Sequence, residues 1–556
     1  MKRRILAGMM ALLMVTGLFA VTSKDAVAAS TPPLNPNPVP DNAWDLMPEL
    51  NVGWNLGNSL ENQTFTKGFC PVSEFASLET RRNNPVTTKA MIDAVAEAGF
   101  SSIRIPVSFY NHLKESEPAR NGVPQPGRTI DPEWLDRIEE VVRWAYDNEL
   151  YVIINNHHDT SMWDEHMSWI HADKKTYEKD VKEYKNLWAQ VAKRFKDLDY
   201  HLIFQSTGEI VNTKRVTTQG DLRFDAYHSY QDFQVAHDYN QEFIKTVRET
   251  GSNNTNRFLI LETYAANAEP VFIDQCFYKA YEDAPGVRGR LIFGVHCYHD
   301  DPEEMRAVMK GLAIKSVQYN MPYIIDECGT KYSLNQDTRV EVARALSEES
   351  ARYGAAVMIW DDGLGEFGLF DRTETMKKKE PVGYRYVPGD TSYKLKSYEI
   401  VGTLVTAKNH IKPLTKEQLR TLYDNRYQVR TFQGLDQSNV DVLTSGHYAQ
   451  THTDAANPVS ELVPTPAYYA AFSTYVYAEG ADFTATMPAG MKVVIREHDR
   501  NRRFIKTVVV EPGGTYHPSE NAFYLGIGFR YTDTSVRLKD YIQAVNDGYI
   551  RLQKTD

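Results

Sequence analysis

The stretch YVIINNHHD at residues 151–159 shows the pattern that decides the fold. Its first residues are rich in β-branched side chains, which favour a buried β-strand, and polar residues close the run from Asn155 onward. An amphipathic pattern precedes it over Glu133–Asn148, where apolar residues recur at helical spacing. Strands that alternate with helices in this way predict βαβ units and a parallel sheet.

The same alternation continues on both sides of this stretch. The predicted strands are Asn51–Leu56, Ser102–Val107, Tyr151–Asn156, His201–Gln205, Arg257–Thr263, Leu291–Cys297, Pro322–Asp326 and Ala355–Trp360. Helical patterns follow them, and the last helix is expected around Glu399–Asn409. This order predicts an α/β protein whose main domain is a (β/α)8 TIM barrel over residues 45–412. A helical bundle cannot explain the strands, and no Gly-rich phosphate loop follows the first strand, as a doubly wound sheet would need.

The pattern changes beyond the barrel. Short runs rich in Val, Tyr, Phe and Thr, separated by Gly, Pro and Asn, predict a smaller all-β domain, a β-sandwich, over residues 428–556. Its clearer strands are Ala470–Tyr477, Asp482–Met487, Met491–Glu497, Ile505–Val510 and Phe523–Tyr531. A carbohydrate-binding role and a packing role are both open for this accessory domain.

The first residues have the features of a targeting segment. A basic head at Lys2–Arg4 precedes an apolar run over Ile5–Val21 and the small residues Ala26-Val27-Ala28. This arrangement predicts a secretory signal peptide over residues 1–28, cleaved near Ala28, and a Pro-rich leader over residues 29–44. No other apolar run reaches the length of a membrane span, so we expect a secreted, extracellular protein with no membrane partner.

Composition excludes some classes of partner. The chain has 62 Lys and Arg against 73 Asp and Glu, a net charge of −11, which argues against nucleic acids and anionic membranes. Neutral substrates fit this balance better. The spacing of the four cysteines fixes no disulfide pairing, and Cys297 and Cys328 are expected to fill small buried spaces.

Polar side chains close the predicted strands, at the end of a barrel where active sites lie. Glu209 follows the fourth strand and Glu327 the seventh. Glycoside hydrolysis needs two such carboxyl groups, one to protonate the leaving oxygen and one to attack C1. The candidate substrate-binding residues nearby are Arg104, His157, His296, Tyr298, Trp360 and Asn58.

In order and spacing these motifs resemble glycoside hydrolase family 5, the cellulase family of retaining (β/α)8 enzymes. The similarity covers residues 45–410 and rests on GWNLGNSLE (53–61), SIRIPVSF (102–109), YVIINNHHD (151–159), HLIFQSTGE (201–209), FGVHCYHD (293–300), PYIIDECG (322–329) and VMIWDDG (357–363). It implies Glu209 as acid/base and Glu327 as nucleophile.

Each neighbour then has an expected role. Arg104 would favour the charged form of the nucleophile, while the acid/base keeps its proton. Tyr298 would donate to the nucleophile, His157 and His296 would hold sugar hydroxyls, and Trp360 would stack beneath a pyranose ring. Retaining geometry would place the two carboxyl groups about 5–5.5 Å apart.

Weaker candidates lie in the loops. Trp163 and Trp169 are candidate sugar platforms, and Asn58 and Glu61 are weaker substrate contacts. The run His157-His158-Asp159 could suggest a metal site, but adjacent residues of a strand point to opposite faces. We therefore expect no metal and no cofactor.

One motif departs from the family. Asn normally precedes the acid/base and Pro follows it, whereas this chain has Thr207-Gly208-Glu209-Ile210. The missing Asn would bond the sugar 2-hydroxyl, so Gly208 is expected to leave room for a substituent or a differently posed sugar. Asn212 is the expected replacement donor.

The favoured function is a secreted retaining β-glycosidase, an endo-β-1,4-glucanase-like hydrolase that acts on a polysaccharide or oligosaccharide by double displacement. The same mechanism on another substituted or non-glucan polysaccharide remains open, as does a glycan-binding protein with reduced or no hydrolytic activity. The resemblance also implies a monomer.

Overall fold

The computed structural model describes residues 39–160, 168–212, 230–372 and 394–424, and then the segments 443–445, 447–451, 460–464, 469–472, 476–477, 482–487, 490–499, 504–522, 524–531 and 551–554. The predicted signal peptide and most of the predicted leader lie outside these residues. Among the helices of the described ranges, none is long and apolar enough to cross a membrane.

Eight parallel strands close into a barrel in the order β1-β10-β9-β8-β7-β6-β5-β2, which confirms the predicted fold class. They are β1 (Val52–Leu56), β2 (Ser102–Val107), β5 (Tyr151–Asn156), β6 (Leu202–Gln205), β7 (Leu259–Asn267), β8 (Leu291–Cys297), β9 (Tyr323–Cys328) and β10 (Ala356–Asp361). Almost all of their residues are buried, because helices cover one face and the barrel core the other, and this explains the continuous apolar runs.

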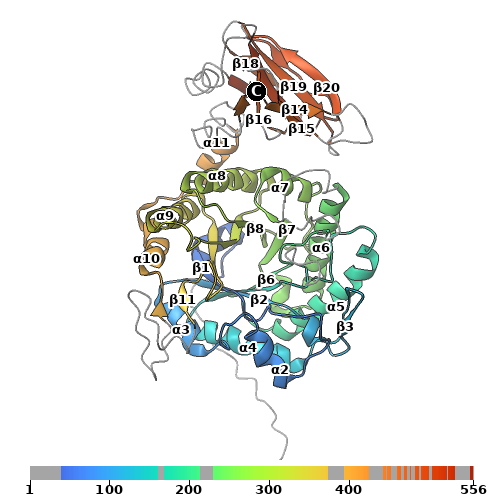
Figure 1. Ribbon diagram of the computed structural model, residues 1–556, viewed down its shortest axis with the longest axis vertical. Helices are drawn as coiled ribbons and strands as arrows, with labels where there is room; N and C mark the ends of the chain where they lie inside the picture. The colour runs from blue at the N-terminus through green and yellow to red at the C-terminus, as the bar shows by residue number, and fades with distance from the viewer. Residues whose placement is uncertain are drawn as a thin grey trace, which may run out of the picture. The chain divides into compact units, whose positions relative to one another are not determined.

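Helices form an outer ring around these strands (Figure 1). They are α2 (Val72–Glu79), α3 (Lys89–Glu97), α4 (Pro132–Asp147), α5 (Tyr177–Phe195), α6 (Tyr230–Glu249), α7 (Pro270–Cys276), α8 (Pro302–Tyr319), α9 (Gln336–Tyr353) and α10 (Tyr398–Thr406), followed by α11 (Lys416–Asp424). Asp-Pro pairs begin α4 and α8, where the carboxylates of Asp131 and Asp301 accept backbone N–H groups of the first turn. Proline at the first helical position needs no such partner, so these pairs set the helix starts.

A short helix, α1 (Ala43–Leu50), closes one end of the barrel. Its residues Leu46, Met47 and Leu50 form a buried cluster with inward side chains of the strands, including Ile153 and Ile324. Because these residues lie near the strands' beginnings, α1 covers the amino-terminal end. The cleft described below therefore opens at the opposite end.

Strand β7 is longer than predicted and irregular. Glu262 pairs with Gly294 of β8, but the next pair is Asn267 with His296, so β7 has an insertion relative to its neighbour. Ala265 and Ala266 have φ values of 57° and 51° within it. The predicted strand ended at Thr263 because nothing in the local pattern announces a bulge of this kind.

The described C-terminal strands pair in three sheets. They are β13 (Leu443–Ser445), β14 (His447–Thr451), β15 (Ser460–Pro464), β16 (Tyr469–Phe472), β17 (Val476–Tyr477), β18 (Phe483–Thr486), β19 (Met491–His498), β20 (Phe504–Val510), β21 (Thr515–Tyr516), β22 (Tyr524–Tyr531) and β23 (Arg551–Lys554). Within the predicted strand Ala470–Tyr477, the structure describes β16 as far as Phe472 and then β17, and both pair with β22. The sandwich itself stays a prediction.

Candidate active site

A cleft of about 790 Å³ lies at the carboxyl ends of the barrel strands. The predicted site residues that line it are Asn58, His157, Glu209, His296, Tyr298, Glu327 and Trp360. Arg104 is fully buried and bonds to Glu327, one of the lining residues. Trp163 lies outside the described residues. The barrel topology thus brings together side chains that are far apart in the sequence.

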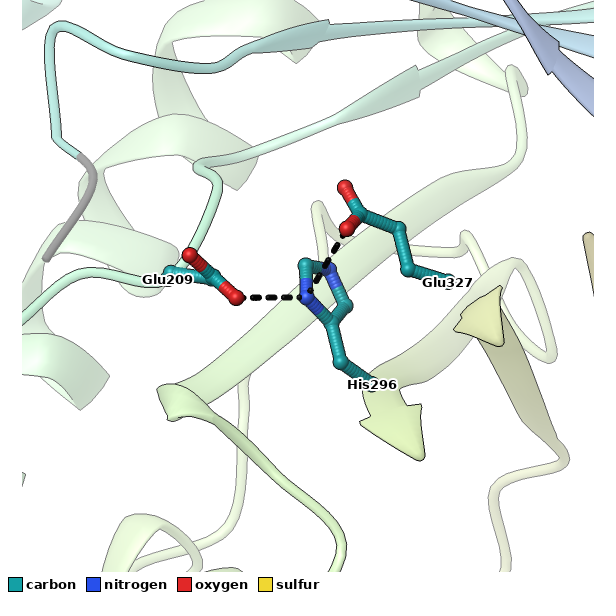
Figure 2. A group of neighbouring side chains, drawn as sticks. All are labelled: Glu209, His296 and Glu327. Atoms are coloured by element: carbon teal, nitrogen blue, oxygen red, sulfur yellow. Dashed lines mark hydrogen bonds and ion pairs between the residues drawn. The ribbon is translucent and has the colours of Figure 1, made fainter. Parts of the chain in front are cut away.

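The two glutamates lie on either side of one histidine (Figure 2). Nδ1 of His296 lies 3.0 Å from Oε1 of Glu209 and 3.4 Å from Oε2 of Glu327. One carboxylate oxygen of each glutamate and one ring nitrogen of His296 all lie within 4.8 Å of one another. This separation is in the short range of retaining glycosidases and too short for the water that an inverting enzyme places between its carboxyl groups.

Glu327 is held by two donors. Nη1 of Arg104 donates to Oε1 over 2.7 Å, and the Tyr298 hydroxyl donates to Oε2 over 3.1 Å. Burial nevertheless raises the pKa of Glu327, and the opposing charges of His296 and Arg104 do not cancel this effect. Arg104 thus lowers the pKa of Glu327, in the expected direction, but the loss of solvent around the carboxyl group outweighs this one cation.

Arg104 is fixed in turn by two residues that sequence reasoning missed. Its Nη1 donates to Oδ1 of Asn55 over 2.9 Å, and its Nε donates to Oε1 of Gln205 over 2.7 Å. Both side chains are fully buried. Asn55 lies on β1, which pairs with β2, and Gln205 lies on β6, which is separated from β2 by β5. The available signal was a polar residue within an otherwise apolar strand, which implies a buried partner.

His296 and His157 differ in charge. Burial lowers the pKa of His296, but Glu327, Glu209 and Asp326 together raise it above the ordinary value. Burial lowers the pKa of His157 well below the ordinary value, and the charges of neighbouring cations act in the same direction. His296 therefore keeps a second proton to higher pH than a free histidine does, whereas His157 loses its second proton at lower pH.

The tautomer of His157 follows from its neighbour. Nδ2 of Asn155 lies 3.1 Å from Nδ1 of His157, and because an amide nitrogen only donates, Nδ1 accepts. Nε2 then carries the hydrogen, and it lies 3.8 Å from Oε1 of Glu327. His157 can thus donate to a sugar hydroxyl beside the nucleophile.

Gly208 leaves no free space, contrary to expectation. A Cβ at this position would lie 2.8 Å from Nδ1 of His157 and 3.2 Å from Nδ2 of Asn155. The room that glycine opens is occupied by these protein groups. Asn212 is also not the replacement donor, because it is buried and its amide donates to Asp232 over 3.1 Å.

Glu209 has an unusual backbone. Its φ of 43° lies in the left-handed region, which is costly for a residue other than glycine. The next residue, Ile210, accepts a hydrogen bond of 2.9 Å from the Ala265 N–H in the β7 bulge. The bulge therefore braces the loop that carries Glu209.

The tryptophans have different surroundings. Trp360 is half-buried in the cleft wall, and its ring stacks on His157 at a centroid distance of 5.8 Å. Trp169 is 6% exposed, and its Nε1 donates to Asp159 over 2.6 Å. The prediction of Trp169 as a sugar platform is therefore wrong, since its ring packs inside the protein.

The loop after β1 carries Asn58 into the cleft with a φ of 57°. Its N–H and that of Ser59 donate to the carboxyl group of Glu61. Burial raises the pKa of Glu61 to about 7. Glu61 thus positions this loop from below and does not line the cleft itself.

His157 and His158 do not point to opposite faces, contrary to the expectation from strand alternation. His157 and His158 both line the cleft, with rings 4.7 Å apart, because β5 ends at Asn156 and strand alternation no longer applies. In the described part of the chain, the groups that could hold an ion are Glu209, His296 and Glu327, and Glu262, His296 and Asp326. His158 belongs to neither.

All four cysteines are buried and unbridged. Cys297 Sγ lies 3.6 Å from the sulfur of Met305, and Cys328 Sγ lies 3.6 Å from the Met358 carbonyl oxygen. Both contacts fit the predicted role of small buried filler.

Comparison with known proteins agrees with this geometry. Residues 64–363 match the family profile Cellulase (glycosyl hydrolase family 5). Endoglucanase B of Ruminococcus albus is 31% identical over 352 residues, which cover 60% of this chain and 77% of that protein. Endoglucanase A of Paenibacillus barcinonensis is 28% identical over 416 residues, or 67% of this chain and 94% of that one.

Solved structures share the barrel. A family 5 lichenase from Caldicellulosiruptor sp. F32, in complex with cellotetraose, is 28% identical with a TM-score of 0.53, covering 67% of this chain and 96% of that chain. The closed barrel, the paired glutamates and the profile match lead to one conclusion: this chain belongs to glycosyl hydrolase family 5 and is a glycoside hydrolase of a retaining family.

Proposed function

We propose that the protein is an endo-β-1,4-glucanase that hydrolyses its polysaccharide by double displacement, with Glu327 as nucleophile and Glu209 as acid/base. The observation that carries this proposal is the close approach of the two carboxyl groups beside His296. One oxygen of Glu209 and one oxygen of Glu327 lie within 4.8 Å of each other. The name of the Ruminococcus albus relative, an endoglucanase, supports the choice of reaction.

In the first step, an oxygen of Glu327 attacks C1 of the sugar while the glycosidic oxygen leaves with the proton of Glu209. Arg104 and Tyr298 hold the attacking carboxylate through bonds of 2.7 and 3.1 Å. Charge moves from Glu327 to the leaving oxygen, where Glu209 neutralises it by proton transfer.

In the second step, Glu209 takes a proton from a water molecule, whose oxygen attacks C1 and displaces Glu327. Two inversions at C1 leave its configuration unchanged. Nδ1 of His296 lies 3.0 Å from Oε1 of Glu209, so the imidazole is within reach to pass a proton to this carboxyl group.

Three residues of the cleft wall are available to contact the sugar. His157 Nε2–H is available to a hydroxyl of the sugar next to Glu327, and the half-buried Trp360 offers a flat apolar surface for a pyranose ring. Asn58 lines the same cleft on the far loop.

A second substrate class is favoured by one feature. Gly208 supplies no amide for the sugar 2-hydroxyl, and His157 and Asn155 occupy the space beside it. A different hydroxyl pattern at this subsite, as in a substituted or non-glucan polysaccharide, would suit that wall. Structures similar to this chain include a lichenase bound to cellotetraose, which favours the glucan.

The experiment measures reducing-end release from carboxymethylcellulose, mixed-linkage β-glucan, xyloglucan, mannan and xylan by the protein without residues 1–28. Glu327→Gln should abolish release, whereas the matched control Glu341→Gln, on the exposed face of α9, should not. NMR of the first product should show the β-anomer. Release confined to xyloglucan, mannan or xylan would select the second class, and binding without release would indicate a glycan-binding protein.

We also propose secretion through the predicted signal peptide and a monomeric state. Expression of the full chain should yield an extracellular protein whose first residue lies near Ala29. Light scattering of that protein should give the mass of one chain.

A further inference from the structure

Beneath the catalytic glutamates lies a second pair of carboxyl groups that the mechanism above does not use. Glu262 ends the regular part of β7, and Asp326 directly precedes Glu327 on β9. Both side chains are fully buried in the barrel core. Two buried carboxyl groups side by side are costly unless a proton or a cation compensates them.

A glycine allows the two groups to meet. Gly294 of β8 lies between them and pairs with Glu262. A Cβ at this position would lie 2.7 Å from Oδ2 of Asp326 and 3.2 Å from Oε2 of Glu262. The absence of a side chain at residue 294 therefore makes the space in which these oxygens approach each other.

Gln205 fixes how the pair is oriented. Its Oε1 accepts from Nε of Arg104, so its amide nitrogen must point the other way, where it donates to Oε2 of Glu262 and Oδ2 of Asp326. One oxygen of each carboxyl group is thereby used. The remaining oxygens, Oε1 of Glu262 and Oδ1 of Asp326, make no hydrogen bond within the described ranges.

The free oxygen of Asp326 faces His296. Its Oδ1 lies 3.7 Å from Nε2 of His296, the nitrogen opposite the one that contacts Glu209 and Glu327. Nε2 is buried and has no other partner among the described residues. The imidazole thus lies between the catalytic glutamates on one side and Asp326 on the other.

We propose that Glu262 and Asp326 share one proton, held on Glu262, and that the remaining charge on Asp326 keeps His296 protonated between Glu209 and Glu327. Asp326 is then a positioning residue that acts through His296 and touches no substrate. This inference rests on the proposed function, since it gives His296 the proton that Glu209 needs.

The electrostatics of the neighbours agree with this arrangement. Burial and the adjacent Asp326 raise the pKa of Glu262 well above its ordinary value, which agrees with a proton on Glu262. The groups that surround His296 are Glu209 after β6, Glu262 on β7, Tyr298 after β8, Asp326 and Glu327 on β9, and Arg104 and His157 across the barrel. Acidic groups predominate among them, so a protonated imidazole is the stable state.

The direction of the pH effect follows. A histidine whose pKa is raised stays protonated to higher pH, so His296 sets the basic limb of the activity profile. Asp326→Asn removes the facing charge and should move that limb to lower pH by at least about one unit. Glu262→Gln replaces a neutral carboxyl group by a neutral amide and should move it by less than about 0.3 unit.

The experiment compares the pH profiles of kcat/KM for the wild type, Asp326→Asn and Glu262→Gln on a soluble β-glucan. The control is Asp274→Asn, which disturbs another buried carboxylate, paired with Lys315 over 2.7 Å between α7 and α8, and should leave both limbs in place. Should Asp326→Asn fail to fold, Gly294→Ala displaces the same carboxyl group and should move the basic limb in the same direction.

A readout without substrate separates this inference from the proposed function. In ¹⁵N-histidine NMR of the whole protein, the signal lost in His296→Gln should titrate at lower pH in Asp326→Asn. This holds even for a protein that hydrolyses nothing. The proposal is overturned if that titration is unmoved, if Glu262→Gln shifts it as far as Asp326→Asn, or if elemental analysis finds one bound divalent metal per chain in place of the proton.

Discussion

A methyl group at residue 208 should collide with His157, and this collision can be measured. The added carbon would lie 2.8 Å from Nδ1 of His157, whereas ordinary contacts begin near 3.4 Å. His157 is 3% exposed and packed between Asn155 and Trp360, so it has no solvent to move into. Gly208 does not have a positive φ, so the effect of Gly208→Ala comes from this contact and not from the backbone.

The expected size follows from overpacking of a tight interior. Such substitutions cost about 1–3 kcal/mol. For a barrel of this size, that corresponds to a fall in Tm of about 1–4 °C. The imidazole must shift by roughly 0.6 Å relative to Glu327, and misplacement on this scale should lower kcat/KM by about 10- to 100-fold.

The assay combines calorimetric Tm with kcat/KM on the β-glucan that the wild type hydrolyses. Gly311→Ala is the matched control, because its methyl group on α8 meets nothing within 4 Å. It should raise stability by about 0.5–1 kcal/mol and leave kcat/KM unchanged. In a His157→Ala background, Gly208→Ala should cost no further stability. If Gly208→Ala preserves both Tm and kcat/KM while the control behaves as stated, His157 does not fill the space beside residue 208.

Three further outcomes are expected. Arg104→Gln removes a charge that lowers the pKa of Glu327, so the acid limb of the pH profile of kcat/KM should move to higher pH. The value of kcat/KM should also fall at least about 100-fold. A shift of the acid limb to lower pH would contradict the assigned electrostatics. The Asp361 carboxylate accepts from Trp54 Nε1 over 2.8 Å and from Arg372 over 3.0 Å. Asp361→Ala removes this buried acceptor and should lower the free energy of unfolding, measured with denaturant, by about 3–5 kcal/mol. A loss below about 1 kcal/mol would show that these two pairs contribute little. Dialysis against EDTA should leave kcat/KM within twofold, because two carboxyl groups suffice for the reaction, whereas activity lost and then restored by a divalent ion would require a metal.

Much of the barrel could be predicted because its strands are buried on both faces. Their β-branched runs are continuous, and the bounds of β2, β5 and β8 agree with the predicted ones. The catalytic pair could be predicted for a related reason. In a parallel barrel all carboxyl strand ends meet at one rim, so Glu209 and Glu327 must lie near each other wherever the loops go.

Local patterns failed where a long-range contact decides the outcome. Trp169 appeared as a loop tryptophan, but a hydrogen bond to Asp159 buries it. Gly208 suggested open space, but His157, about fifty residues earlier in the chain, fills it. The β7 bulge has no local signal, because backbone contacts with the loop after β6 stabilise it.

The sequence by itself therefore determined the barrel, the rim on which the site lies and the two glutamates. Strand periodicity and strand ends are visible in short stretches of sequence, and the parallel topology then places all the carboxyl ends at one rim. The tertiary structure decided the state of those groups. Solvent exclusion raises the pKa of Glu327 despite Arg104, and carboxyl groups on β9 and in the loop after β6 raise the pKa of His296 despite its burial. Burial and electrostatic potential sum over every neighbour within a few ångströms, and only the folded chain brings those neighbours together.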